Sequence, residues 1–249
     1  MATLTAMDLR GRVGVVTGGG VRVGRAVALG LARSGVDVFI HYNRSAGSAE
    51  DTAQEIRDLG VRAEIGSVDL SDPATASQLI DLATQSLGTP SILVNSASGF
   101  PADTIGDVTL EQWRHTFDLT LASPVFVTQA LANALPDDVD GAVVNVTDVR
   151  TQRPYRERFS YIVAKGAIDT FTKAAALQLA PRIRVNAVAL GVILPPPQED
   201  DDYAERLAAQ LPLERTGGTA PVVAAVLSLI ENDFVTGEIV RIDGGGHLS

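Results

Sequence analysis

Seven short runs of apolar, largely β-branched residues recur along the chain, and a segment long enough to form a helix separates each run from the next. The runs cover residues 13–17, 36–42, 61–68, 92–95, 142–147, 183–190 and 238–242. Strands that are apolar without alternation are buried on both faces, which requires helices above and below the sheet. The pattern therefore predicts an α/β chain, a doubly wound Rossmann fold with a seven-stranded parallel sheet flanked by helices on both faces.

The segments between these runs predict the helices. They cover residues 23–34, 48–59, 73–87, 110–135, 161–180 and 221–231. No linker or repeat interrupts the rhythm, so we expect a single domain over residues 1–249. The exception is a run of three prolines and four acidic residues between positions 195 and 202. It predicts a substrate loop or lid at about 191–215, and a solvated surface loop is the alternative.

Composition narrows the classes of function. The 249 residues include no cysteine and only three scattered histidines, so disulfides, thiolate chemistry and metal catalysis are not expected. A formal net charge of −10 disfavours binding to nucleic acid or to anionic membranes. Neither a signal peptide nor a membrane-spanning run is visible, so we expect a soluble, cytoplasmic protein.

The first apolar run leads directly into the glycine-rich sequence Thr-Gly-Gly-Gly-Val-Arg-Val-Gly-Arg, which begins at Thr17. Glycines from Gly18 onward let backbone N–H groups approach a pyrophosphate, and a helix starting near Val23 points its positive end at the same place. This turn predicts a dinucleotide site, with a ligand-free strand-to-helix turn as the alternative. Arg22 stands where the usual fingerprint has its middle glycine.

The end of the second run indicates which dinucleotide binds. It reads His-Tyr-Asn-Arg-Ser and contains no carboxylate, the group that usually accepts hydrogen bonds from the NAD ribose. Arg44 and Ser45 instead offer a cation and a hydroxyl donor to a 2′-phosphate. Arg22 would add a second cation near the same pocket. NADP(H) is therefore the expected cofactor, and an ordinary surface charge is the alternative for Arg44.

Tyr161 and Lys165 lie four residues apart in a predicted helix and so share one of its faces. A phenol with an ordinary pKa of about 10 is a reluctant acid at neutral pH. An ammonium one turn away, together with the positive charge of bound nicotinamide, is expected to lower that pKa. The pair therefore predicts a general acid.

Five short motifs occur in order along the chain: Gly18 to Gly24, Asn95-Ser96-Ala97, Tyr161 with Lys165, Arg184-Val185-Asn186 and Asp243-Gly244-Gly245. Together they resemble the short-chain dehydrogenase/reductase family over nearly the whole chain. The resemblance implies that Tyr161 is the catalytic acid or base and that Lys165 also binds the nicotinamide ribose. It implies that Asn95 supports the central strand. The residues expected to bind NADPH are Gly18, Arg22, Val23, Asn43, Arg44, Ser45, Asp69, Leu70, Asn95, Ala97, Ser98, Tyr161, Lys165 and Val192.

Within that family the chain is similar to the pteridine reductases. Asp148 stands where the family usually has its catalytic serine, and the arginine of the glycine turn, the His-Tyr-x-Arg-Ser segment and Asn-x-Ala-Ser-x-Phe at 95–100 are shared with this subgroup. The resemblance implies that a pterin ring lies between the nicotinamide and Phe100. It also implies that Arg22 reaches both the pterin and the cofactor phosphates, with Ser98 beside them.

We therefore expect NADPH-dependent hydride transfer to the C=N bond of a dihydropterin or dihydrofolate. Asp148, Tyr161 and Lys165 are the expected catalytic residues, because a carboxyl group can pair with the amidine-like edge of a pterin. The residues expected to bind substrate are Arg22, Phe100, Asp148 and Tyr161. Asp148 as a strand-end cap and Phe100 as a core aromatic are the simpler alternatives. The alternative functions are a carbonyl or 3-oxoacyl reductase and a non-catalytic NADP-binding regulator.

Some positions depart from the family pattern. Thr120 replaces an asparagine that anchors a water relay to the lysine, Leu190 replaces a proline after the sixth strand, and Arg158 stands where some pteridine reductases have an aromatic residue. These changes bear on the substrate rather than the fold. The family commonly forms tetramers, so a homotetramer is expected. The apolar segments 119–135 and 166–179 are compatible with that interface and equally with core helices.

Overall fold

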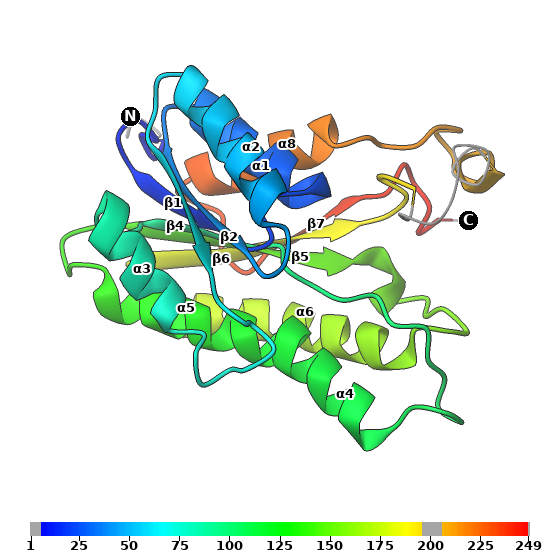
Figure 1. Ribbon diagram of the computed structural model, residues 1–249. Coiled ribbons are helices and arrows are strands. Elements are labelled where there is room, and N and C mark those ends of the chain that lie inside the picture. The colour runs from blue at the N-terminus through cyan, green and yellow to red at the C-terminus, as the bar shows by residue number, and fades with distance from the viewer. Residues whose placement is uncertain (1–5, 196–205, 249) are drawn as a thin grey trace.

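The computed structural model describes residues 6–195 and 206–248 of the chain. Seven strands form one parallel sheet in the order β3-β2-β1-β4-β5-β6-β7 (Figure 1). Their bounds are β1 Val13–Val16, β2 Asp37–Tyr42, β3 Ala63–Ser67, β4 Ile92–Asn95, β5 Gly141–Asp148, β6 Ile183–Leu190 and β7 Ile239–Ile242. The predicted seven-stranded parallel sheet and Rossmann fold are confirmed.

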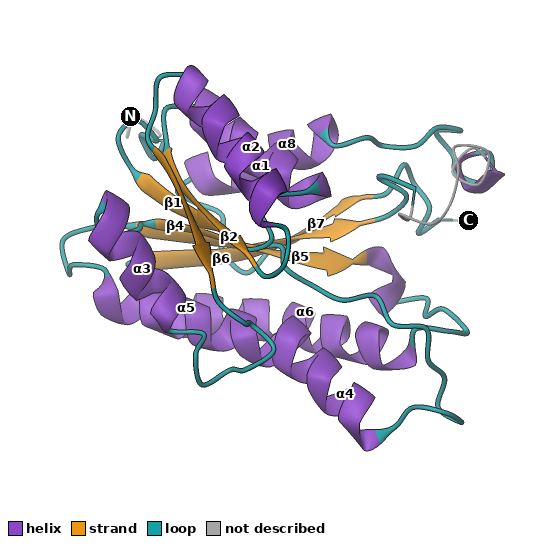
Figure 2. Ribbon diagram, in the orientation of Figure 1, coloured by secondary structure: helices purple, strands orange, loops and turns teal. Residues whose placement is uncertain are grey.

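Helices cover both faces of the sheet, as Figure 2 shows. One layer contains α1 (Arg22–Arg33), α2 (Ala46–Asp58) and α8 (Ala220–Glu231). The other contains α3 (Gln78–Leu87), α4 (Leu110–Phe117), α5 (Ser123–Ala134) and α6 (Phe159–Leu179). None of the helices in the described part of the chain is long and apolar enough to cross a membrane.

The five inner strands, β1, β2, β4, β5 and β6, divide their side chains between two buried layers. Val16 and Ile40 pack in the cluster with α1, α2 and α8, whereas their neighbours Val15 and Phe39 pack in the cluster with α3 and α5. Successive side chains of a strand point to opposite faces, so a strand buried on both faces needs apolar residues at every position. This explains why the runs in the sequence are continuous rather than alternating.

Two predicted helices differ from the structure. The segment 110–135 is not one helix, because a π-helical turn at Asp118–Ala122 separates α4 from α5. Pro124 lies in the first turn of α5 and has no N–H to continue the α-helical hydrogen bonds into α4. Helix α3 begins at Gln78 rather than at residue 73. Asp72 accepts a hydrogen bond from the backbone N–H of Ala74 at 3.0 Å and holds that stretch in turns.

The topology brings the carboxyl ends of several strands together. The chain order reverses between β1 and its neighbour β4, and in such sheets ligands bind where the order reverses. The hydroxyl of Thr17, at the end of β1, accepts hydrogen bonds from the N–H groups of Ser96 and Ala97, both at 2.9 Å. The glycine turn and the loop after β4 are therefore tied together. The segment expected as a lid, 191–215, falls partly outside the described residues.

Candidate active site

The glycine turn is held by the second strand. The backbone N–H of Gly18 donates to Nδ1 of His41 at 3.1 Å, and the N–H of Gly19 donates to the carbonyl of His41 at 3.0 Å. Gly18 has φ of +64°, which favours glycine. A Cβ on Gly24 would collide with the carbonyl oxygen of Gly18. The close approach of turn and helix thus depends on these two glycines.

The turn leaves a helix N-terminus suited to an anion. No side chain caps α1 at Val21, and the first turn of the helix contains no acidic residue. Backbone N–H groups at such a terminus, with the helix dipole, bind phosphate well. These features fit the pyrophosphate of a dinucleotide, and Gly18 and Val23 lie where the sequence predicted.

Arg22 is the first residue of α1 and has φ of +53°, an uncommon backbone for a residue with a side chain. Its guanidinium donates to the carbonyl of Pro195 at 2.8 Å, after the end of β6. The side chain therefore joins the glycine turn to the segment that follows β6. Val192 lies in that same segment, where its carbonyl accepts the N–H of Gly217 at 2.9 Å.

His41 is a site residue whose structural role the sequence reasoning missed. Its ring is buried, and Nε2 lies 2.8 Å from the carbonyl of Val68 while Nδ1 accepts from Gly18. Burial is the main cause that lowers the pKa of His41, so the neutral ring with a proton on Nε2 is favoured. The sequence feature that could have indicated this role is a histidine within an otherwise apolar strand.

The expected 2′-phosphate site lies at the exposed end of β2. Asn43, Arg44 and Ser45 are all exposed there, and Ser45 is the residue before α2. Asp69, at the end of the neighbouring strand, accepts hydrogen bonds from Ser71, which are the main cause of its lowered pKa; the charge of Arg44 acts in the same direction. Leu70 is buried beneath. The structure thus brings the predicted adenosine-end residues to one edge.

The predicted catalytic residues also come together. The hydroxyl of Tyr161, on α6, donates to Oδ2 of Asp148 at the end of β5 at 3.0 Å. Nζ of Lys165, one turn further along α6, donates to the carbonyl of Val146 at 2.7 Å. All three functional side chains are buried. The phenol, the carboxyl and the ammonium therefore form one compact group.

The loop that follows β4 also lies beside Tyr161. The ring of Phe100 meets the ring of Tyr161 edge to face, with centroids 4.9 Å apart, and Phe100 is 46% exposed. It lines the site rather than packing into the core. Ser98 is exposed, and its Oγ lies 3.5 Å from Oγ1 of buried Thr120 in the π-helical turn. Asn95 is buried and donates to Oδ1 of Asn145 on β5 at 2.9 Å.

Burial dominates the electrostatics of Tyr161. Burial, followed by the negative charge of Asp148, raises the pKa of Tyr161 well above its usual value. The lowering expected from Lys165 together with the charge of bound nicotinamide stays a prediction for the NADP complex. Burial likewise raises the pKa of Asp148, although its hydrogen bonds from Arg150 and Tyr161 act the other way. Of these two groups, the Asp148 carboxyl has the pKa shifted towards the neutral range, where a general acid works best.

Lys165 predicts a pH dependence of cofactor binding. Burial lowers the pKa of Lys165 from 10.5 to about 8. The ammonium therefore loses its charge as the pH rises through about 8, and the contacts with the nicotinamide ribose that the sequence predicts for it should weaken. We expect the affinity for NADPH, measured by fluorescence titration, to decrease above this pH. In Lys165→Met the affinity should be lower and independent of pH over the same range; an identical decline in the variant would contradict the assignment.

Asp103 is a second residue that the sequence reasoning missed. It is buried in the loop after Phe100, and its carboxylate accepts hydrogen bonds from the N–H and the hydroxyl of Ser160, the former at 3.0 Å. Ser160 lies in the first turn of α6, immediately before Tyr161, and no neighbouring side chain of the helix caps this end. Asp103 thus supplies the missing cap from another loop.

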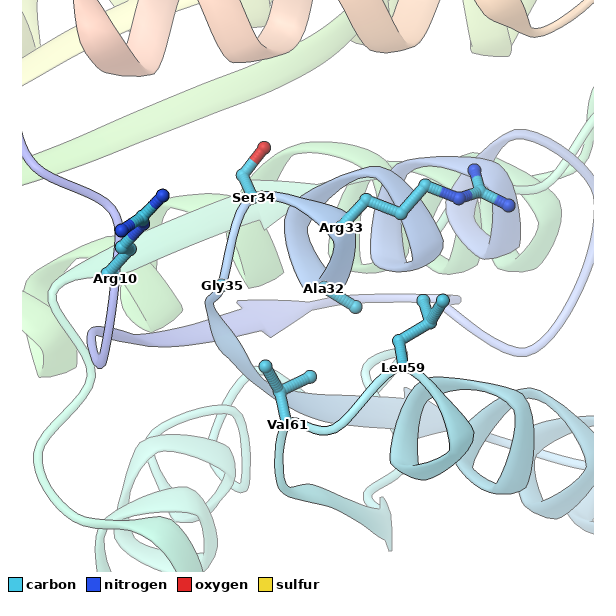
Figure 3. Close-up of a pocket in the computed structure, with 7 residues that line it drawn as sticks. All are labelled: Arg10, Ala32, Arg33, Ser34, Gly35, Leu59 and Val61. Atoms are coloured by element: carbon cyan, nitrogen blue, oxygen red, sulfur yellow. The ribbon is translucent and has the colours of Figure 1, made fainter.

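A separate pocket lies away from this group (Figure 3). It is lined by Arg10, Ala32, Arg33, Ser34, Gly35, Leu59 and Val61. Arg33 is the last residue of α1, whereas the glycine turn precedes the first. A helix of this length extends about 18 Å at 1.5 Å per residue, so the pocket is remote from the dinucleotide site. The described residues contain no group of three or more His, Cys, Asp or Glu side chains that could hold a metal ion.

Comparisons with known proteins place the chain in a family. Residues 20–247 match the family model described as enoyl-(acyl carrier protein) reductase. A ketoacyl reductase of the granaticin polyketide synthase from Streptomyces violaceoruber is 34% identical over 244 residues, covering 95% of this chain and 96% of that protein.

Solved structures agree with this placement. FolM alternative dihydrofolate reductase 1 from Brucella canis, complexed with NADP, superposes with a TM-score of 0.90 at 36% identity, covering 99% of this chain and 97% of that one. A short-chain dehydrogenase from Burkholderia cenocepacia, also with NADP, has a TM-score of 0.89 at 29% identity and covers 96% and 99%. These matches agree with the fold, the glycine turn and the Tyr161–Lys165 pair. The chain therefore belongs to the short-chain dehydrogenase/reductase family of oxidoreductases.

Proposed function

We propose that this NADP-dependent short-chain oxidoreductase reduces the C=N bond of a dihydropterin or dihydrofolate. The observation that carries the proposal is the hydrogen bond of 3.0 Å between Tyr161 and Asp148. It places a carboxyl group where the family usually has a serine hydroxyl. A serine hydroxyl can donate a hydrogen bond but is a very weak acid, whereas a protonated carboxyl can transfer a proton to a ring nitrogen.

The chemistry needs one hydride and one proton. When bound, NADPH would supply the hydride for the carbon of the C=N bond. The nitrogen takes a proton from Asp148, whose pKa is raised by burial, and the C=N bond becomes a C–N single bond with a new N–H. Tyr161 keeps its proton at neutral pH and holds Asp148 Oδ2 in place, while Arg150 donates its backbone N–H to Oδ1 at 2.8 Å.

Phe100 supports a flat aromatic substrate. Its ring is half exposed beside Tyr161, and a ring at that position offers a stacking surface for a pterin. The structural similarity to a protein named as an alternative dihydrofolate reductase is in accord with this substrate class. Arg22 is proposed as a further substrate contact from the glycine turn.

The test is an assay of NADPH oxidation with dihydrofolate and dihydrobiopterin. We expect turnover of at least one of them by the unmodified enzyme. A panel of pterins that leaves NADPH unoxidised would overturn the proposal. Tight NADPH binding without turnover of any pterin or ketone would instead favour a non-catalytic NADP-binding regulator.

Asp148→Ser gives the sharpest prediction for this assay. Removal of the carboxyl is expected to lower kcat/KM for the pterin by about 10² or more, in line with the loss of a general acid. The isosteric Asp148→Asn variant is expected to lose activity equally, because an amide cannot donate a carboxylic proton. Pterin activity that persists in both variants would show that Asp148 is a strand-end cap only.

A ketone is the second candidate substrate, and the 34% identity to a ketoacyl reductase favours it. In that case Asp148 has no role in proton transfer, and Asp148→Ser restores the hydroxyl that polarises a carbonyl oxygen. Ketone reduction by Asp148→Ser is then expected to exceed that of the unmodified enzyme. Asp148→Ser therefore distinguishes the two candidate substrates, because it is expected to lower activity on a pterin and to raise activity on a ketone.

We also infer that the chain assembles as a homotetramer. Phe126 on α5 and Leu177 on α6 are 42% and 84% exposed, so apolar side chains remain on the outer surfaces of two helices. Burial of such surfaces between subunits is favourable. Size-exclusion chromatography with light scattering is expected to give four times the chain mass, and the mass of a single chain would contradict the assembly.

A further inference from the structure

The segment between β5 and α6 is strongly basic in an acidic chain. Residues 150–158, which we call the arginine segment, include one acidic residue and four arginines, Arg150, Arg153, Arg156 and Arg158. The chain as a whole has a formal net charge of −10. Positive charge is therefore concentrated in one short loop, and this loop directly follows Asp148 and precedes Tyr161.

Two of these arginines are packed on aromatic rings that lead to the site. The guanidinium of Arg158 lies 4.3 Å from the centre of the Phe100 ring and donates to the carbonyl of Phe100 at 3.0 Å. The guanidinium of Arg150 lies 5.0 Å from the centre of the Tyr155 ring. Tyr155 in turn meets Phe100 edge to face at 6.2 Å. Cation–π contacts of this kind hold both charges at the rim beside Phe100.

The arginine segment forms no ion pair within the described structure. Over residues 6–195 and 206–248, none of the four arginines lies within ion-pair distance of a carboxylate. Other exposed arginines of the chain do form pairs, such as Arg57 with Glu50 at 2.7 Å. A guanidinium has five N–H donors, and the bond to Phe100 uses one donor of Arg158. Donors therefore remain for an anionic ligand.

The backbone also fixes Arg158. Its φ of +66° and ψ of +37° are left-handed, which is costly for a residue with a side chain. Strained residues of this kind occur frequently at ligand-binding positions, where neighbouring contacts maintain them. For Arg158, the contacts with Phe100 maintain this backbone conformation, and they place the guanidinium beside the ring proposed to stack on the pterin.

We propose that the arginine segment binds carboxylates on the part of the substrate that extends beyond the pterin ring. The ligand class is a pterin with an anionic substituent, such as the glutamate end of dihydrofolate, in preference to a neutral pterin such as dihydrobiopterin. Arg158 and Arg150 make the contacts, since guanidinium and carboxylate pair in a bidentate manner. This inference rests on the proposed reduction of a pterin and adds the chemical class of its side chain.

The first experiment compares two substrates in variants. The measured quantity is the ratio of kcat/KM for dihydrofolate to kcat/KM for dihydrobiopterin. We expect Arg150→Ala and Arg158→Ala each to lower this ratio by about tenfold, the usual size of one lost charge-assisted hydrogen bond. Arg158→Lys should retain part of the preference. Arg33→Ala, the same charge change at the far end of α1, should leave the ratio unchanged.

The dependence of the substrate preference on salt is a second measurement, and it would not change if the arginines only supported the loop. The preference for dihydrofolate is expected to decrease with ionic strength in the unmodified enzyme and to depend less on salt in the double variant of Arg150 and Arg158. An equal loss of activity on both substrates, with no change in their ratio, would show that the arginines only support the loop and would overturn the proposal.

The second experiment separates this inference from the proposed function. The probe is p-aminobenzoylglutamate, which carries the carboxylates without a pterin, and its binding to the NADP-loaded enzyme is measured by calorimetry. We expect saturable binding that is lost in the double variant and kept in Arg33→Ala. If this holds while no pterin is reduced, the anion site stands and the proposed reaction fails. If the probe does not bind, or binds the double variant equally well, the anion site is refuted whatever the reaction.

Discussion

Replacement of Tyr161 by phenylalanine is expected to lower kcat for NADPH-dependent reduction by up to about 10² to 10⁴, the usual contribution of a positioned general acid, because Asp148 is no longer held in position. The substitution removes the hydroxyl that donates to Asp148 at 3.0 Å and keeps the ring that meets Phe100. Asp148 then loses a hydrogen bond that orients its carboxyl. The rate is measured as loss of NADPH absorbance at saturating substrate, and NADPH affinity is measured separately by fluorescence.

The matched control is Tyr155→Phe, which removes a phenol hydroxyl from the other tyrosine near Phe100. This control is expected to retain nearly all activity, because Tyr155 is 39% exposed at the rim and the substitution keeps the ring that meets Phe100. A Tyr161→Phe enzyme with the rate of the unmodified protein would contradict the proposed role of the phenol in holding Asp148.

The second large effect concerns the choice of cofactor. Arg44→Asp is expected to weaken NADPH binding by about 10- to 100-fold while changing NADH binding little, because a charge-assisted hydrogen bond worth about 1.5–3 kcal/mol is lost. The new carboxylate at the end of β2 also repels a 2′-phosphate and can accept hydrogen bonds from a ribose. Dissociation constants for both cofactors, measured in parallel, give the change in preference.

Arg33→Asp serves as its control, since it makes the same charge reversal on an exposed residue at the far end of α1. It is expected to leave the NADPH preference intact. Equal losses of NADPH and NADH affinity in Arg44→Asp would instead assign Arg44 to the surface, and the expected recognition of the 2′-phosphate would be wrong.

The sheet was largely predictable because its signal is repeated seven times and does not depend on distant contacts. Ile92–Asn95 and Ile183–Leu190 match the structure at both ends, and the other strands differ by a residue or two. Helix boundaries were less predictable. The π-helical turn at Asp118–Ala122 arises where a proline must be accommodated inside an otherwise apolar helical stretch, and periodicity alone cannot show how the chain does so.

Parts of the site were predictable where the spacing of residues along a helix or strand fixes how their side chains lie. Tyr161 and Lys165 share a helix face, and Asp148 follows from its place at the end of a strand. The pKa of Tyr161 was not predictable, because its direction depends on how deeply the ring is buried and on which charge is nearer. Asp103 and the ring of His41 were missed for a related reason. Each acts through contacts with residues far away in the sequence.

The cap that Asp103 provides has a consequence for changing the enzyme. Phe100 and Asp103 belong to one loop, and this loop grips the start of α6 through Ser160 and through the bond from Arg158 to the carbonyl of Phe100. The proposed substrate surface and the proposed catalytic phenol are therefore connected through the same contacts. Substitutions that reshape the loop for a new substrate are expected to shift Tyr161 as well, so selectivity and turnover would have to be engineered together.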